Sequence, residues 1–184
     1  DKTKDIGLIP EPIINALQRE HDQPIYTLAR NGVLPIEKIG QTARLWTEGA
    51  QAVPRLQEAL DDKDASVRYW AAIGLGNLAE HAGKAQRDLE KGLEDASPTV
   101  SIAAARALCR MNHCDEALTT LEESLRSEHE WVRLHAALVL DEIDEQARPA
   151  ISALKSVMDD KNKYVVRVAN RALNQLQGTE HVVP

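Results

Sequence analysis

The chain has 184 residues and a formal net charge of −7, and only 3% of its residues are aromatic, with no phenylalanine among them. An acidic balance disfavours nucleic acid as a partner, because phosphate binding requires a concentrated basic surface. No segment approaches the roughly 18 consecutive apolar residues that indicate a membrane span. We therefore expect neither nucleic acid nor a membrane as partner, and a core built from leucine, alanine, valine and isoleucine.

Prolines and glycines divide residues 1–48 into short pieces. A helix is expected from about Pro12 to His21, a second apolar piece covers residues 24–29, and a third helix is expected from about Pro35 to Trp46. The apolar residues of the first and third pieces recur at helical spacing: Ile13, Ile14, Leu17, Ile36, Ile39, Ala43 and Trp46. This pattern predicts an extended lead-in followed by capping helices that cover the open end of a repeat array.

A single pattern then recurs four times at an almost constant spacing. It is aligned on four valines separated by 33, 32 and 33 residues: Val67, Val100, Val132 and Val165. Alanine stands four residues after every valine, and leucine stands eight residues after it. A repeat of this length that lacks strand-like alternation predicts a pair of antiparallel helices, which buries its apolar face only by stacking on neighbouring pairs.

The sequence therefore predicts an all-α fold, an α-α superhelix of about four helix pairs with an N-terminal cap. The expected repeats cover residues 49–82, 83–114, 115–147 and 148–178, and residues 179–184 are expected to be a frayed tail with nothing to pack against. Gly178 supplies the expected end of the last helix. The eight expected helices cover residues 51–60, 64–80, 84–94, 98–111, 115–126, 129–143, 147–159 and 162–177.

The turn Asp-x-x-x-x-Val-Arg, followed by Ala-Ala-x-x-Leu, resembles the HEAT repeat family in its short bacterial form, over roughly residues 49–178. Ser101 and Val166 replace the arginine found as Arg68 and Arg133, and Ser127 replaces the turn aspartate. We therefore expect the ladder of arginine–aspartate pairs that such turns form to be interrupted.

Residues able to perform chemistry are few. Cys109 and Cys114 are expected to be free thiols, because a disulfide at that spacing requires the helix to have ended between them. Cys109, His113 and Cys114 offer metal-ligand types, but a fourth ligand is missing nearby.

The group Asp61, Asp62 and Asp64 is expected to form turns and cap a helix, since the glycine and distal glutamate of a calcium loop are absent. Glu128, His129 and Glu130 are expected at a helix start, where acidic residues are common. The chain alone is not expected to be an enzyme, and neither a cofactor nor a metal is expected in it.

One surface of the second helices is a candidate partner-binding site. If the valine and its periodic successors face the core, the second and sixth positions after it lie roughly opposite and should be polar. Instead they form a ridge that is apolar and aromatic at one end and basic at the other, completed by neighbouring side chains: Tyr69, Trp70, Ile73, Ile102, Arg106, Trp131, Leu134, His135, Leu138, Arg167 and Arg171. Exposed apolar surface of this kind typically binds a partner. The alternative is that these side chains fill gaps between adjacent second helices.

The lead-in carries a second resemblance. The segment Thr3-Lys4-Asp5-Ile6-Gly7-Leu8-Ile9-Pro10-Glu11 is similar to the stretch that closes the catalytic domain of bacterial sulfatases of the arylsulfatase type, some of which continue into HEAT arrays. This resemblance, together with a first residue that is not methionine, implies a C-terminal fragment of a periplasmic or secreted sulfatase. The family's calcium ion and its formylglycine nucleophile would belong to a catalytic domain upstream of Asp1, because the motif Cys/Ser-x-Pro-Ser/Ala-Arg is absent here.

Three functions remain open on the sequence. The first is a non-catalytic HEAT domain that packs on its own sulfatase domain or mediates protein interaction. The second is a free-standing HEAT scaffold for another protein, which would be cytoplasmic. The third is a HEAT protein similar to the bilin lyases of antenna proteins.

Overall fold

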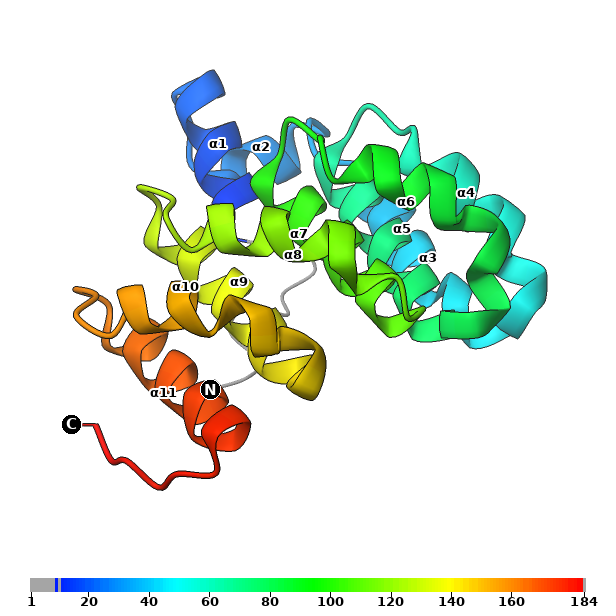
Figure 1. The fold of residues 1–184 in the computed structure, drawn as a ribbon. Coiled ribbons are helices and arrows are strands. Elements are labelled where there is room, and N and C mark those ends of the chain that lie inside the picture. Colours follow the sequence, from blue (N-terminus) through cyan, green and yellow to red (C-terminus); the bar gives the residue numbers. More distant parts are fainter. Residues whose placement is uncertain (1–8, 10, 184) are drawn as a thin grey trace.

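The structure, a computed structural model, describes residue 9 and residues 11–183, apart from the side chain of Glu11. Every regular element in this part of the chain is helical, and the elements follow one another as a curved array (Figure 1). No helix among the described residues has both the length and the apolar character of a membrane span. The predicted all-α fold is confirmed.

Three helices precede the array and eleven helical elements build it. The three are α1 (Glu11–His21), α2 (Ile25–Arg30) and α3 (Ile36–Arg44). The first helices of the four pairs, three of which open with a 3-10 turn, are η1 (Leu45–Ala52) with α4 (Val53–Leu60), η2 (Ala79–Ala85) with α6 (Gln86–Gly92), α8 (Cys114–Ser124), and η3 (Asp144–Ala150) with α10 (Ile151–Ser156). The second helices are α5 (Ala65–Leu78), α7 (Pro98–Arg110), α9 (Glu130–Glu142) and α11 (Lys163–Gln177).

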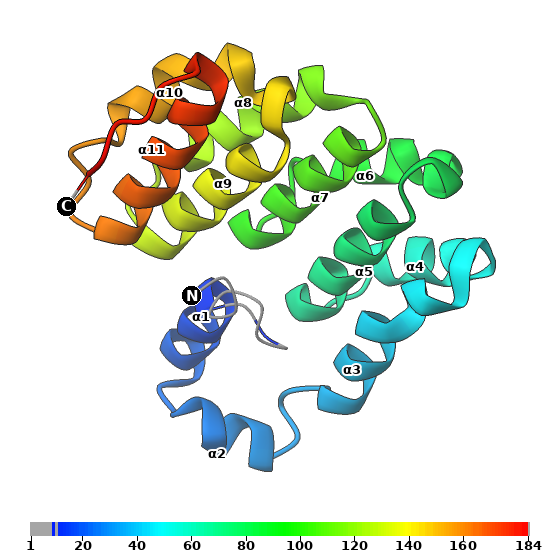
Figure 2. The same cartoon turned by 90° about the horizontal axis from the view of Figure 1, so that it is seen from below.

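The second helices line the inner, concave side of the array, and the first helices lie outside them (Figure 2). Small residues allow the close approach that this stacking needs. A Cβ added at Gly76 of α5 would come within 2.9 Å of the Cα of Ala107 on α7. The apolar repeat positions join one continuous core, in which the four aligned valines are at most 2% exposed. The array is thus a solenoid whose core depends on contact between neighbours.

Two helices of the lead-in pack at different places on the array. Helix α3 packs against α5, the second helix of the first pair. Helix α1 instead contacts α7 and α9 and lies on the concave side of the array (Figure 2). This position differs from the prediction that the whole lead-in covers the open end of the first repeat.

Arginine–aspartate pairs join the turns of successive repeats where the sequence retains both partners. Arg68 donates from Nε and Nη2 to the carboxylate of Asp95, at 2.7 and 2.8 Å. Arg133 makes the same paired contact with Asp160, at 2.5 and 2.9 Å. Between these two rungs stands Ser101, whose hydroxyl donates instead to the carbonyl of Pro98 on its own helix. The ladder therefore lacks the rung between the second and third repeats, as the sequence predicts.

The last helix ends as predicted, but the segment after it does not fray. Gly178 closes α11 in the left-handed conformation, with φ 64°. Asn170 and Asn174 each donate from their side-chain amides to the carbonyl of His181, both at 2.7 Å. The expectation that residues 179–184 have nothing to pack against is therefore wrong up to His181. Asn170 occupies a position that is alanine in the other repeats, and here the tail takes the place of a next repeat.

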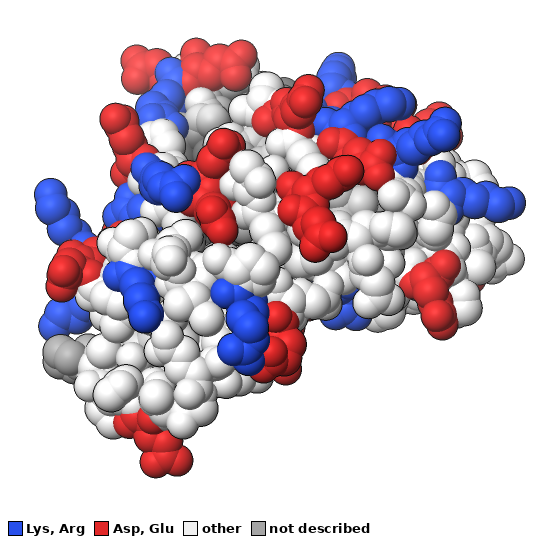
Figure 3. All heavy atoms as spheres, viewed as in Figure 1, with Lys and Arg blue, Asp and Glu red and all other residues white. Residues whose placement is uncertain are grey.

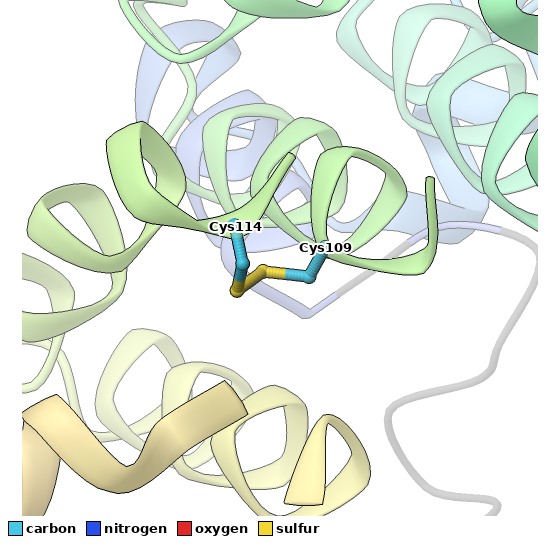
Figure 4. The surroundings of a disulfide bond; sticks show 2 residues. All are labelled: Cys109 and Cys114. Atoms are coloured by element: carbon cyan, nitrogen blue, oxygen red, sulfur yellow. A yellow bond between two sulfur atoms is a disulfide. The ribbon is translucent and has the colours of Figure 1, made fainter. Parts of the chain in front are cut away.

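The cysteines form a disulfide, so the prediction of free thiols is wrong (Figure 4). Helix α7 ends at Arg110, and Asn112, with φ 65°, turns the chain so that Cys114 begins α8. Asparagine is one of the few residues that adopt this conformation readily. The same turn takes His113 out of the helix that carries Cys109, and no group of three potential metal ligands occurs among the described residues.

Replacing Arg133 by leucine should lower the free energy of unfolding by about 2 kcal/mol, because the carboxylate of Asp160 would lose both hydrogen bonds. Those hydrogen bonds hold the pKa of Asp160 below its ordinary value of 3.8. Their contribution is therefore present above that value and is lost as the pH falls through the lower folded pKa. Urea denaturation at pH 7 and at acid pH measures both effects.

The matched control is Arg148→Ala, which removes an exposed pair with Glu145 within one turn. Exposed pairs contribute roughly 0–1 kcal/mol. An equal loss of stability in both variants would contradict a structural role for the ladder.

Candidate functional site on the concave face

The concave side of the array contains a groove of about 620 Å³. All four second helices contribute to it, together with one residue of η1 at the open end of the first repeat. The residues that line it are Trp46, Tyr69, Trp70, Ile73, Asn77, Arg106, His135, Leu138, Val139, Asp141, Glu142 and Arg171.

Aromatic and aliphatic side chains form the apolar part of the groove. The ring of Tyr69 meets the ring of Trp70 edge-on at 5.3 Å between centroids, and it lies 6.0 Å from the ring of His135. Tyr69 belongs to α5 and His135 to α9, so side chains of these two helices meet across α7. At one end Trp46 keeps 40% of its surface exposed. This leaves a large apolar side chain at the mouth of the groove.

Charged side chains in the groove are paired with one another. Arg106 donates to both carboxylate oxygens of Glu142 at 2.7 Å, and Arg110 donates to the same carboxylate at 3.0 Å. Arg171 forms an ion pair with Asp141. Burial alone would raise the pKa of Glu142, but hydrogen bonds and charge from Arg106 and Arg110 outweigh burial and lower it. The groove therefore presents mutually neutralised charges beside its apolar surface.

His135 is held in its neutral form. Burial lowers its pKa from 6.5 to about 4, and the positive charge of Arg106 acts in the same direction. A neutral imidazole offers one donor and one acceptor nitrogen. At neutral pH the groove thus contains a polar but uncharged ring between the aromatic cluster and the Arg106–Glu142 pair.

The residues of the predicted ridge lie in different places in the structure. Seven of them line the groove: Tyr69, Trp70, Ile73, Arg106, His135, Leu138 and Arg171. Trp131 lines a separate cleft beside α1, and Arg167 is exposed outside both.

The expectation of exposure is wrong for Tyr69, Ile102 and Leu134, which are buried. Tyr69 is enclosed by the rings of Trp70 and His135. Helix α1 packs on α7 and α9, the helices that carry Ile102 and Leu134. Ile102 and Leu134 follow the alternative, in which ridge residues fill gaps between helices, whereas Tyr69 is buried but still lines the groove.

Sequence reasoning missed groove residues at the ends of the second helices. Asn77 and Glu142 stand ten residues after the aligned valines of their repeats, one turn beyond the second and sixth positions of the ridge. Extending that stripe by one turn would have found both of them and also Arg110. Trp46 and Asp141 carry no such signal, because their place depends on how the repeats curve.

The aspartate-rich turn has the structural role that was predicted for it. The Asp64 carboxylate caps α5 by accepting from the backbone N–H groups of Ser66 and Val67. Asp62 accepts from the backbone N–H of Asp64 and forms an ion pair with Lys38 of α3. These carboxylates therefore join the lead-in to the first repeat and cap its second helix.

Comparisons with known proteins support the repeat assignment. A family model described as HEAT repeats matches residues 86–174, and one described as HEAT repeat matches residues 52–82. No curated protein sequence matches the chain. The crystal structure of an engineered protein from the Northeast Structural Genomics Consortium is similar, with a TM-score of 0.56 and 22% identity, over 79% of this chain and 76% of its own. At that identity the likeness shows the fold alone.

The environment of His135 predicts a pH-dependent stability. Because its folded pKa is about 4 and its ordinary value is 6.5, the unfolded chain binds the proton more readily between these values. The stabilising contribution of neutral His135 is therefore fully present above pH 6.5 and is lost as the pH falls from 6.5 to 4. Denaturation of wild type and His135→Gln should show a stability difference that changes in this interval and is constant above it. An imidazole NMR titration with a midpoint near 6.5 would contradict this assignment.

Proposed function

Because the chain is built of HEAT repeats, we propose that it is a protein-interaction module whose concave groove binds a segment of a partner protein. HEAT repeats generally mediate such interactions, and solenoids bind partners through their concave surfaces. The observation that carries the proposal is the groove itself, which places Trp46, Ile73 and Leu138 beside a set of paired charges.

The chemistry of the groove defines the segment that it would bind. Its arginines already have carboxylate partners, so a phosphate or another strong anion would have to break those pairs. On the face drawn in Figure 3, over the first helices, lysine and arginine side chains are likewise interspersed with aspartate and glutamate. An uncharged peptide segment with one large apolar side chain suits the groove better. That side chain would fill the apolar part, and backbone amides would meet His135 and Asn77.

Selection of peptides from a displayed random library against the full chain tests this proposal. Selected peptides should share a central apolar or aromatic residue, and Leu138→Asp should weaken their binding at least tenfold, because a carboxylate would replace an apolar wall of the groove. The matched control is Val33→Asp, which places the same charge at an exposed apolar position outside the groove. Peptides that bind Leu138→Asp as well as wild type would show that the groove is not the site.

A more specific form of the proposal identifies the partner. The lead-in match to sulfatases lies almost wholly outside the described residues, so it remains an argument from sequence. The Cys109–Cys114 disulfide supports it independently, because such bonds persist in oxidising compartments such as the periplasm or the extracellular space. We infer a sulfatase parent whose upstream catalytic domain, with calcium and formylglycine, would pack against this array.

The intact mass and reading frame of the parent gene product test this form. A sulfatase parent requires the motif Cys/Ser-x-Pro-Ser/Ala-Arg in frame upstream of Asp1. Translation that starts next to Asp1 would exclude the sulfatase and leave a free-standing scaffold. The peptide-binding groove would be unaffected by that outcome.

A further inference from the structure

Helix α1 occupies a second part of the concave face, away from the groove. It contacts both α7 and α9 (Figure 2). Ile13 is only 5% exposed and belongs to the same hydrophobic cluster as Ile102 and Leu134 of these two helices. Ile9 and Leu17, four residues to either side of Ile13, also pack against that cluster. Helix α1 thus contacts the array through one apolar stripe, in the way that an amphipathic helix binds in a groove.

The surface beneath α1 lies where the arginine–aspartate ladder is interrupted, although the Cys109–Cys114 disulfide joins the same two repeats elsewhere. The ladder has no rung between Ser101 and Ser127, and α7 packs less extensively against α9 than against α5. The two helices are held together at their C-terminal ends, where Arg106 and Arg110 meet Glu142. Among the described residues no ion pair joins their N-terminal halves, and that is where α1 lies.

The outer side of α1 is exposed to solvent. Ala16, Arg19, Glu20 and His21 are exposed, and so is the connection over residues 22–24. The helix has 11 residues, and a helix of that length is marginal in water without packing. Its position therefore depends on the stripe around Ile13.

Charges beside α1 define the orientation of a bound helix. Asn15 and Arg19 line a cleft of about 430 Å³ together with Glu128, Glu130, Arg133 and Lys161, of which Arg133 is paired with Asp160. A helix that binds here contacts apolar residues along one stripe and charged residues of both signs, Glu128 and Glu130 among them, on its flank. A basic side chain two residues beyond the second apolar anchor, as Arg19 follows Leu17, can pair with Glu128 or Glu130.

We propose that the surface of α7 and α9 beneath α1 is a binding site for an amphipathic helix of a partner protein, and that α1 is its internal occupant. The partner helix carries two apolar residues four positions apart and a basic residue on the adjacent flank. It displaces α1 and joins the N-terminal halves of α7 and α9 in its place. The inference rests on the proposed function for taking the concave face as the binding face, but it concerns a different part of that face.

The experiment uses the full chain with α1 released. Ile13→Asp places a charge in the buried stripe, and Ala16→Asp, the matched control, places it on the exposed side of the same helix. The probe is a fluorescent peptide of residues 11–21, titrated against wild type and both variants. Ile13→Asp should bind it at least tenfold more tightly than wild type or Ala16→Asp, and the peptide that itself carries Ile13→Asp should not bind.

Hydrogen exchange decides whether the variant is suitable. Amides of α1 should lose protection in Ile13→Asp while those of α9 keep it. Protected α1 amides, or no peptide binding to a variant with intact α9, would overturn the inference. Should Ile13→Asp unfold the array, Leu17→Asp takes its place at the half-buried end of the stripe.

A final variant separates this inference from the proposed function. Leu138→Asp, added to Ile13→Asp, should leave binding of the α1 peptide unchanged, because Leu138 lines the groove and not the α1 surface. Loss of binding in the double variant would place the peptide in the groove, and the α1 surface would then not be a separate site.

Discussion

The apolar face of each helix pair can be buried only against a neighbouring pair, and this constraint organises the whole chain. Inside the array, alanine and glycine at the contact positions let the second helices approach closely, as Gly76 and Ala107 do. At the two ends of the array that the structure describes, other parts of the chain take the place of a neighbouring pair. Helix α3 packs on α5 at the first repeat, and Lys38 ties it to the turn aspartate Asp62. At the last repeat Asn170 binds the returning tail.

The junction between the second and third repeats is the exception inside the array. The arginine–aspartate rung is missing beside the N-terminal halves of α7 and α9, while Arg106, Arg110 and Glu142 join the C-terminal ends. The difference between the two ends accounts for both features of the concave face. The groove lies at the joined ends, where paired charges surround apolar side chains, and α1 lies over the ends that are not joined.

The sequence predicts those features of the fold that are set within one helix or one repeat, and not those set by contacts between distant segments. The valine-aligned repeat predicts the four helix pairs, because periodicity along one helix decides which face is buried. The interrupted ladder follows from Ser101 and Ser127, because partners in such a ladder have fixed positions in the repeat. The place of α1 does not follow, since its stripe would suit any apolar surface.

The same distinction applies to the candidate site and the disulfide. Seven of the ridge residues reach the groove because the helical period places them there, whereas Trp46 and Asp141 arrive through the curvature of the stack. The burial of Ile102 and Leu134 depends on contacts between distant segments, which periodicity does not describe. For the cysteines, the sequence predicts that one helix ends and the next begins between them, but not the left-handed backbone conformation of Asn112 that turns the chain there.

The disulfide also bears on the groove, because of where it lies in α7. Cys109 is adjacent to Arg110 and one turn from Arg106, so the bond to Cys114 holds the end of the helix from which both arginines reach Glu142. A site whose side chains are already fixed loses less conformational entropy when a partner binds. Fixing this helix end therefore favours binding without adding a contact to the partner. In a reducing environment the bond would open, and the helix end that supports the groove would lose its covalent link to α8.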